Sequence, residues 1–292
     1  MSFSYNASPG RPCFRFIMNM YEAVTGHPLH FRYVYGQTTL STLNEVVITG
    51  VIYFVVIFGG QRLMVNHSAF ELQKLSRIHN LLLTLASGLL LVLLTEQIGP
   101  LLYHQGFFHA VCGDDSWHSP LDLLYYLNYL LKYWELLDTV FLVLRKKRLE
   151  FLHYFHHSMT LLLCFIIQNE QPGATWVPIV LNLWVHVLMY YYYYRTAAGV
   201  HIWWKKYLTT MQITQFVLDL TVIVFCSYTY FASHYFPRMP HLGHCTATDF
   251  SAIFAPALLG SYLVLFINFY RLTYQSKQSH RRKRLAADTK SL

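Results

Sequence analysis

Residues 78–98 of this sequence read IHNLLLTLASGLLLVLLTEQI, and this stretch decides the class of the fold. An α-helix needs about 20 mostly apolar residues to cross the hydrocarbon core of a bilayer, which is about 30 Å thick. The whole chain is similarly apolar, since 54% of its 292 residues are hydrophobic and only 12% are charged. A soluble domain carries about 25% charged residues. The composition therefore predicts an integral membrane protein, surrounded by lipid and without a nucleic-acid partner.

Seven segments are long and apolar enough to span a membrane as helices. They lie at residues 42–60, 78–98, 121–144, 149–168, 176–194, 207–231 and 250–271. We predict an all-α membrane protein whose seven transmembrane helices form one domain over residues 42–274. An N-terminal segment, residues 1–41, precedes this domain, and a basic tail, residues 275–292, follows it.

The basic residues predict the orientation of the chain in the membrane. Most of the 22 lysines and arginines fall in the loops 61–77, 145–148 and 195–206 or from Arg271 onward, all on one side of the predicted spans. Loops rich in Lys and Arg stay in the cytosol. We therefore expect a cytosolic C-terminus and a lumenal N-terminus. The net charge of +8 suits anionic lipid head groups or an anionic substrate equally well.

Two of the five cysteines fall in different lumenal loops of this arrangement. Cys112 follows the second span and Cys245 precedes the seventh. The oxidising lumen permits a disulfide between them. Two free thiols are the alternative, and the sequence does not choose between the two.

Polar and charged side chains gather inside four of the predicted spans. They are Lys132, Glu135, Asp138, Thr139, His153, His156, His157, Asn182, His186, Met189, Tyr190, Tyr193, Gln212, Gln215 and Asp219. An ionisable residue at bilayer depth costs several kcal/mol unless it is paired or faces a wet cavity, so each one suggests a function. For the glutamines and Asp219, hydrogen bonding between helices is an equally good explanation. Some of the tyrosines could form an interfacial aromatic belt.

The spacing of these residues predicts how they meet. His153, His156 and His157 are three and four apart, which puts all three imidazoles on one helical face. Lys132 and Glu135 are three apart and close enough to pair, either as a structural ion pair or as part of a site. Three imidazoles on one face of a membrane helix indicate chemistry rather than packing. A non-enzymatic receptor or transporter would not need them.

Two chemistries use histidines in this way. His-x-x-His-His is one of the histidine boxes of membrane di-iron desaturases and hydroxylases, but those enzymes need several boxes, and here His186 stands alone. Alternatively, a neutral histidine attacks a thioester to give an acyl-imidazole, while neighbouring histidines orient it and carry protons. Asn182, Gln212 and Lys132 could stabilise the oxyanion or enolate that develops. We favour the second chemistry and expect no metal at this site.

Four ordered motifs resemble the signature motifs of the ELO family of fatty acid elongases, especially those of its fungal branch. They are Lys132-x-x-Glu135-x-x-Asp138-Thr139, His153-x-x-His156-His157, His186-x-x-Met189-Tyr190-x-Tyr192-Tyr193 and Thr209-x-x-Gln212-x-x-Gln215-Phe216. The resemblance implies the condensation of a long-chain acyl-CoA with malonyl-CoA to 3-oxoacyl-CoA, CoA and carbon dioxide, without a cofactor. It also implies a location in the endoplasmic reticulum membrane. Spans two to seven would ring an acyl tunnel that is open to CoA at its cytosolic end.

The resemblance also assigns roles to the residues. His156 would accept the acyl group, His186 would lie beside the reacting carbons, and His153 and His157 would orient groups and relay protons. Lys132, Arg145 and Lys147 would meet the phosphates of CoA. The other residues expected at the substrate are Glu135, Asp138, Asn182, Tyr190, Gln212 and Gln215. The sequence leaves open the preferred chain length, self-association and contacts with other enzymes of the elongation cycle.

Overall fold

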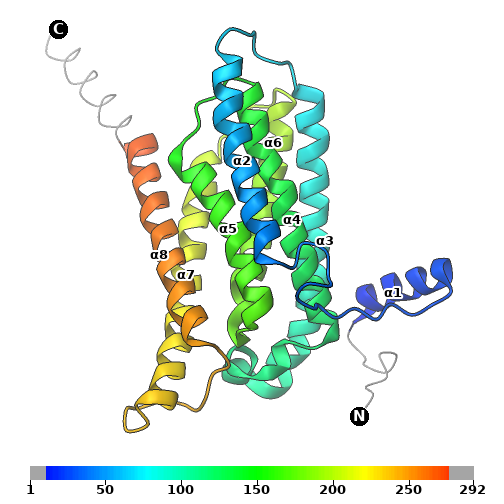
Figure 1. Ribbon diagram of the computed structural model, residues 1–292, viewed down its shortest axis with the longest axis vertical. Helices are drawn as coiled ribbons and strands as arrows, with labels where there is room; N and C mark the ends of the chain where they lie inside the picture. The colour runs from blue at the N-terminus through cyan, green and yellow to red at the C-terminus, as the bar shows by residue number, and fades with distance from the viewer. Residues whose placement is uncertain (1–10, 276–292) are drawn as a thin grey trace, which may run out of the picture.

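The computed structural model describes residues 11–275, and in this range the chain is a bundle of long α-helices without strands (Figure 1). The long helices are α2 (Leu43–Met64), α3 (Gln73–Cys112), α4 (Ser119–Leu144), α5 (Phe151–Glu170), α6 (Trp176–Ala197), α7 (Lys205–Tyr235) and α8 (Asp249–Tyr270). These positions agree with the seven predicted segments. Short elements join or extend them: α1 (Pro12–Thr25), η2 (Asp114–Ser116), η3 (Gly173–Thr175) and η4 (Arg271–Gln275). Most of the predicted basic tail lies outside the described residues.

Five of the helices are long and apolar enough to cross a membrane, judged by length and composition. They are α2, α3, α6 with the preceding η3, α7, and α8 with the first residues of η4. Helices α4 and α5 are not among them. The physical reason lies in their sequences, because α4 carries Lys132, Glu135 and Asp138 and α5 carries the histidine cluster. The structure therefore supports a multi-span membrane protein with at least these five candidate spans.

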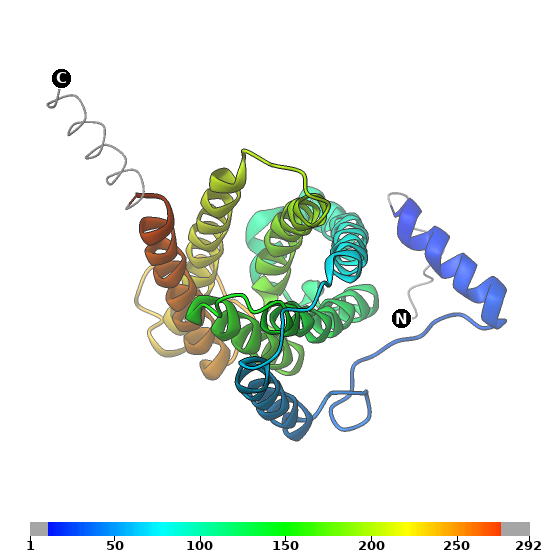
Figure 2. The same ribbon diagram turned by 90° about the horizontal axis from the view of Figure 1, so that it is seen from above.

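Six of the long helices close into a ring. Helix α3 packs against α6, α6 against α7, α7 against α8, α8 against α5, α5 against α4, and α4 back against α3. The view from above shows this arrangement, with α2 outside the ring and α1 projecting away from it (Figure 2). Helix α2 packs against α4 and α5, and α1 packs against α3. The order of packing differs from the order in the chain, so residues far apart in sequence meet inside the ring.

Helix α1 lies in the N-terminal segment, for which the sequence analysis named no helix. Its first backbone N–H groups, those of Cys13 and Phe14, donate to the two carboxylate oxygens of Glu96 on α3, each at 2.9 Å. The first N–H groups of a helix have no partner within the helix, and a carboxylate satisfies them and favours the positive end of the helix dipole. Phe14 is buried against α3.

Helix α3 continues well past the predicted end of its span. The backbone breaks at Gly106, which has a φ of +80° inside the helix. Glycine adopts positive φ without the steric cost of a Cβ atom, so the chain can bend there and resume a helix up to Cys112. The apolar residues after the bend, Ala110 and Val111, are fully buried. Burial of these residues stabilises the extended part of the helix. The hydropathy of a single span does not predict this extension.

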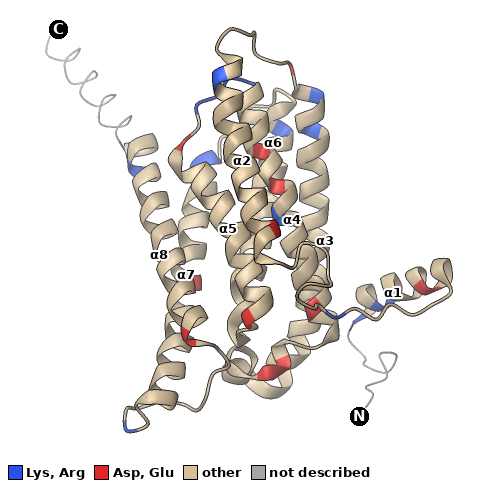
Figure 3. Cartoon of the chain, in the orientation of Figure 1, with Lys and Arg blue, Asp and Glu red and all other residues tan. Residues whose placement is uncertain are grey.

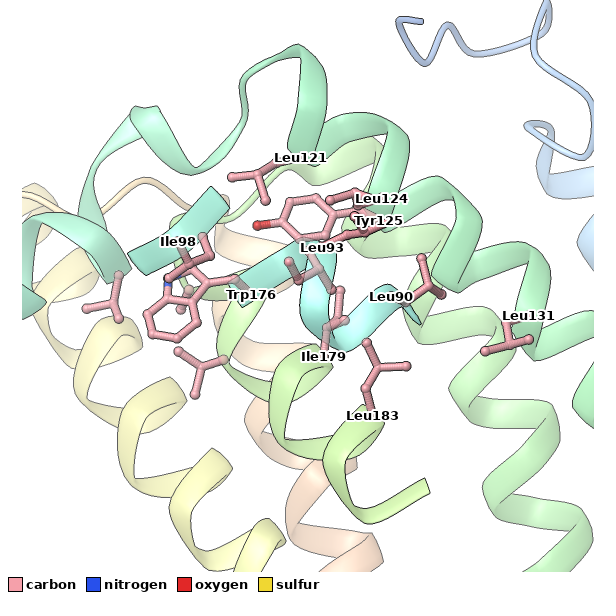
Figure 4. Packing of buried hydrophobic residues seen from close by; sticks show 14 of the residues in the cluster. Leu90, Leu93, Ile98, Leu121, Leu124, Tyr125, Leu131, Trp176, Ile179 and Leu183 are labelled. Atoms are coloured by element: carbon pink, nitrogen blue, oxygen red, sulfur yellow. The ribbon is translucent and has the colours of Figure 1, made fainter. Parts of the chain in front are cut away.

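An apolar core fills one end of the ring. Figure 4 shows side chains from α3, α4 and α6 that meet there, among them Leu93, Leu121, Tyr125 and Trp176. Tyr125 is 1% exposed, and its hydroxyl donates to the carbonyl of Ser116 at 3.2 Å. The side chains of this core pack closely at this end of the ring.

Basic side chains gather at the opposite end of the bundle. Figure 3 shows Lys and Arg around the ends of α2, α4 and α6 and the beginnings of α3 and α7. These are the loops that the charge pattern placed on one side of the membrane, so their common location is confirmed.

Candidate active site

A cavity of about 540 Å³ lies inside the ring and opens among the loops of the basic end. It extends along α6 from Ala197 to Asn182, which corresponds to a depth of about 22 Å at 1.5 Å per helical residue. Most of the predicted site residues line it: Asp138, Arg145, His153, His156, His157, Asn182, His186, Gln212 and Gln215. All six helices of the ring, α3 to α8, line this space, with Ser76 and Asn80 from α3 and Phe266 and Phe269 from α8.

The three histidines of α5 all face this cavity, as their spacing predicted. The ring centroids of His153 and His157 are 4.5 Å apart, and those of His156 and His157 are 5.6 Å apart. The Nε2 atom of His153 is buried and has no hydrogen-bond partner among the described residues. The cluster thus presents a nitrogen that remains available for a proton or a substrate.

His156 is enclosed by aromatic rings on its deeper side. Its ring centroid lies 4.8 Å from that of Tyr262, 5.9 Å from that of Phe266 and 6.3 Å from that of Phe216. The Tyr262 hydroxyl forms a hydrogen bond of 3.1 Å with the Thr160 hydroxyl. An imidazole held between an open cavity and an apolar wall can react with a group that carries an apolar chain.

Four polar side chains form a closed cycle at the cavity wall, where Asn182 and His186 line the cavity and Lys132 and Glu135 lie behind them. Lys132 Nζ donates to Glu135 Oε1 at 2.8 Å and to Asn182 Oδ1 at 2.9 Å. The Asn182 amide nitrogen lies 3.2 Å from His186 Nε2, and His186 Nδ1 lies 3.2 Å from Glu135 Oε1. We call Lys132, Glu135, Asn182 and His186 the buried quartet. The predicted pairing of Lys132 with Glu135 is confirmed.

The buried quartet determines the protonation of His186. A lysine ammonium only donates, so Asn182 must turn its oxygen toward Lys132 and its amide nitrogen toward His186. That nitrogen donates to His186 Nε2, which leaves the imidazole proton on Nδ1 beside the Glu135 carboxylate. The contact of Nδ1 with Glu135 is an ion-pair distance without the alignment of a hydrogen bond.

Asp138 is held from two neighbouring helices. The Tyr190 hydroxyl on α6 donates to Asp138 Oδ2 at 2.8 Å, and His79 Nε2 on α3 lies 2.7 Å from Asp138 Oδ1. Tyr190 is fully buried and supports Asp138 rather than lining the cavity. Sequence reasoning missed His79, because a single histidine in an apolar helix carries no spacing signal.

The basic residues that line the mouth of the cavity differ in part from those predicted. Arg145 lines it as expected, together with Arg148 and Lys205, which the sequence did not single out. Lys147 is exposed on the same loop and does not line the cavity. Lys132 is only 3% exposed and bound within the quartet, so it does not reach the mouth.

The glutamines of α7 line the cavity and also bond within the protein. Gln212 donates to the sulfur of Met189 at 3.5 Å, and Gln215 donates to Asp219 Oδ2 at 3.1 Å. Asp219 is fully buried one turn deeper and does not line the cavity. Gln212 therefore bonds between helices, to α6, whereas Gln215 bonds within α7, and both glutamines face the cavity.

The cysteines and the histidine cluster lie at different places in the structure. Cys112 and Cys245 are joined in a disulfide at the apolar end of the bundle. Among residues 11–275, three potential metal-ligand atoms come within 4.8 Å of one another at Cys112, Cys226 and Cys245, and the histidine cluster forms no such group. The imidazoles do not converge on one point as the ligands of a metal would.

Comparisons with known proteins identify the family of this chain. Residues 38–282 match the model of the ELO family, described as GNS1/SUR4. The chain is 43% identical to "Putative fatty acid elongase 1" of Schizosaccharomyces pombe, over 91% of this chain and 80% of the relative. It is 32% identical to "Fatty acid elongase A" of Dictyostelium discoideum, over 87% of this chain and 91% of that protein. It is also 30% identical to "Very long chain fatty acid elongase 2" of Mus musculus, over 84% and 80%.

The family match and these names confirm the resemblance drawn from the four motifs and do not favour a di-iron desaturase or hydroxylase. The fungal relative has the highest identity of the three. The chain belongs to the GNS1/SUR4 (ELO) family.

Proposed function

We propose that this protein is the condensing enzyme of fatty acid elongation, a 3-oxoacyl-CoA synthase that joins a long-chain acyl-CoA to malonyl-CoA. The observation that carries this proposal is the convergence of His153, His156, His157 and His186 on one cavity with a basic mouth. Both substrates have an anionic CoA head and react at a thioester. The basic mouth can bind the phosphates of CoA, and an imidazole that lines the cavity below it can attack the thioester.

The shape of the interior supports an acyl substrate. Below His156, the aromatic wall leads into an apolar cluster that includes Leu163, Ile167 and Leu259. A second, apolar cavity of about 40 Å³ lies beyond this cluster and shares these three residues. The two cavities are separate in the structure rather than one continuous tunnel. The acyl chain would pass between the side chains of this cluster and extend toward the second cavity.

In the first step, an imidazole nitrogen of His156 attacks the acyl thioester. A carbon–nitrogen bond forms, the carbon–sulfur bond breaks, and CoA leaves with the proton that the imidazole gives up. His157 and His153 are adjacent and carry protons for this exchange. The product is an acyl-imidazole on the enzyme and free CoA.

In the second step, malonyl-CoA loses carbon dioxide and becomes an enolate. The enolate carbon attacks the acyl carbon, the carbon–nitrogen bond to His156 breaks, and the departing imidazolate takes up one proton through the neighbouring histidines, which gives 3-oxoacyl-CoA and the neutral imidazole. Loss of carbon dioxide drives the step, so the reaction requires no redox partner. His186 and Asn182 line the cavity beside the cluster, where they can stabilise negative charge on the enolate oxygen.

The placement in the membrane follows from the charge distribution. We place the basic end in the cytosol, where CoA esters are, and the disulfide end in the lumen of the endoplasmic reticulum. All seven long helices then cross the bilayer. Helices α4 and α5 cross despite their polar residues, because α2, α3, α6 and α8 pack against them and the polar groups face the cavity or the quartet.

A product assay tests the function. Purified protein in detergent or nanodiscs is given radiolabelled malonyl-CoA and saturated acyl-CoAs of graded length. We expect labelled 3-oxoacyl-CoA and one carbon dioxide per product. Desaturated or hydroxylated acyl-CoA without incorporation of label would contradict the proposal.

A further inference from the structure

We infer that His79 is a positioning residue that clamps the Asp138 carboxylate at the wall of the cavity. The inference rests on the proposed function, because Asp138 matters for condensation only if the histidine cavity is where condensation occurs. His79 lies on α3, outside the four sequence motifs, and does not line the cavity. It is 5% exposed and makes both of its polar contacts with α4.

The two polar contacts of His79 determine its tautomer. Trp134 Nε1 donates to His79 Nδ1 at 3.1 Å. An indole N–H has no acceptor capacity, so Nδ1 of His79 must be unprotonated and accept this bond. The imidazole proton is then on Nε2, which donates to Asp138 Oδ1 at 2.7 Å. The pair of His79 and Asp138 is therefore a directed hydrogen bond from a neutral imidazole rather than an ion pair.

The Asp138 carboxylate is held from both sides. Its other oxygen, Oδ2, accepts the hydroxyl proton of Tyr190 at 2.8 Å. One donor comes from α3 and the other from α6, and the carboxylate on α4 lies between them. Two donors on different helices leave the carboxylate little freedom to rotate. Phe141, which lines the cavity, packs edge-on against the His79 ring at 4.9 Å.

The clamped carboxylate of Asp138 lies at the same cavity as the histidine cluster. The Asp138 side chain is 16% exposed and lines the cavity, as His153 does. Asp138 and His153 line the same cavity, and the Nε2 atom of His153 has no partner among the described residues. A carboxylate fixed in this place can orient His153 or balance its charge when it takes up a proton. His79 thereby acts on the reaction through Asp138 and without touching the substrate.

The experiment compares two replacements of similar length. His79→Gln keeps one amide donor for Asp138 and one oxygen acceptor for Trp134, whereas His79→Met keeps neither. We expect His79→Met to lower kcat by roughly 10- to 100-fold, as for a lost hydrogen bond to a charged group. KM for both CoA esters should stay within about 3-fold, and His79→Gln should recover most of kcat. Equal activity of the methionine variant and the wild type would overturn the inference.

A double-mutant cycle separates positioning from a general loss of structure. In an Asp138→Asn background, His79→Met should cause little further loss of kcat, because the group that it positions is already changed. A multiplicative loss would show that His79 acts independently of Asp138. The wild-type enzyme is the reference throughout, so absence of 3-oxoacyl-CoA from the wild type would reject the proposed function and not the clamp.

The clamp itself has a readout that does not depend on activity. In protein with ¹⁵N-labelled histidine, the His79 resonances, assigned by their loss in His79→Gln, should show an unprotonated Nδ1 and a protonated Nε2. Trp134→Phe should release this tautomer and change the Nδ1 resonance. A protonated Nδ1 in the wild type would contradict the clamp, whatever the activities of the His79 variants.

Discussion

The Oδ1 atom of Asn182 lies 2.9 Å from the Nζ atom of Lys132, and this contact turns the Asn182 amide nitrogen toward His186. A lysine that the motif alone would place at the CoA phosphates instead sets the orientation of a histidine in the cavity wall. The buried quartet thus links the charged pair of α4 to the reacting groups.

Asn182→Asp tests this link. The aspartate keeps an oxygen for Lys132 but has no N–H for His186, so Nε2 of His186 loses its donor. We expect kcat to fall by about 10-fold or more, while thermal stability stays close to that of the wild type because Lys132 retains a partner. Steady-state kinetics and thermal unfolding of the purified variant check both parts. An unchanged kcat would show that the orientation of His186 does not depend on Asn182.

Lys132→Met leaves the Glu135 carboxylate buried without its ammonium partner. Breaking a buried ion pair from one side costs about 3–5 kcal/mol, so we expect a clear loss of thermal stability together with severe loss of activity. The double variant Lys132→Met/Glu135→Met should be more stable than Lys132→Met alone and still inactive. If Lys132→Met were as stable and as active as the wild type, neither the pairing nor the quartet would matter.

Arg145→Ala and Lys147→Ala form a matched pair on one loop. Arg145 lines the mouth of the cavity and Lys147 does not. We expect Arg145→Ala to raise KM for the CoA esters by about 3- to 10-fold at low salt, with a smaller effect at high salt because ions screen the attraction. Lys147→Ala should behave like the wild type. The reverse pattern in initial-rate measurements would place the CoA phosphates elsewhere.

Cys112→Ser should destabilise the protein by about 2–5 kcal/mol, the usual effect of losing a native disulfide. Cys245→Ser and the double variant should show the same loss, and dithiothreitol should lower the Tm of the wild type but not of these variants. Condensation activity below Tm should be largely kept, because the disulfide lies at the apolar end of the bundle and not at the cavity. Cys13→Ser serves as the control, since Cys13 is a free, exposed thiol. A wild-type Tm that is insensitive to the reductant would argue against the bond.

The sequence predicted the features that follow from local periodicity. The positions of the seven long helices, the common face of His153, His156 and His157, and the pairing of Lys132 with Glu135 were all predicted correctly. Each depends only on residues within a few turns of one another.

Features that depend on contacts between helices could not be predicted. His79 meets Asp138 across 59 positions of sequence, so nothing near His79 indicates its role. The bond of Lys132 to Asn182, 50 positions away, cannot be read from either motif, and the place of Lys132 at the CoA phosphates, which the family resemblance implied, stays a prediction. Helix α1 was missed for the same reason, since its first N–H groups are satisfied by Glu96, more than 80 residues further along the chain.

The acyl-enzyme is the central element of the proposed mechanism, and intact-protein mass spectrometry with peptide mapping detects it directly. Wild-type protein is incubated with a long-chain acyl-CoA in the absence of malonyl-CoA and quenched. We expect the protein mass to rise by that of one acyl group, located on the peptide that contains His156, and to return to its original value when malonyl-CoA is added. His156→Ala, folded and inserted in the membrane, should show neither the adduct nor 3-oxoacyl-CoA. An adduct or product that persists in His156→Ala would contradict the assignment of His156 as the nucleophile.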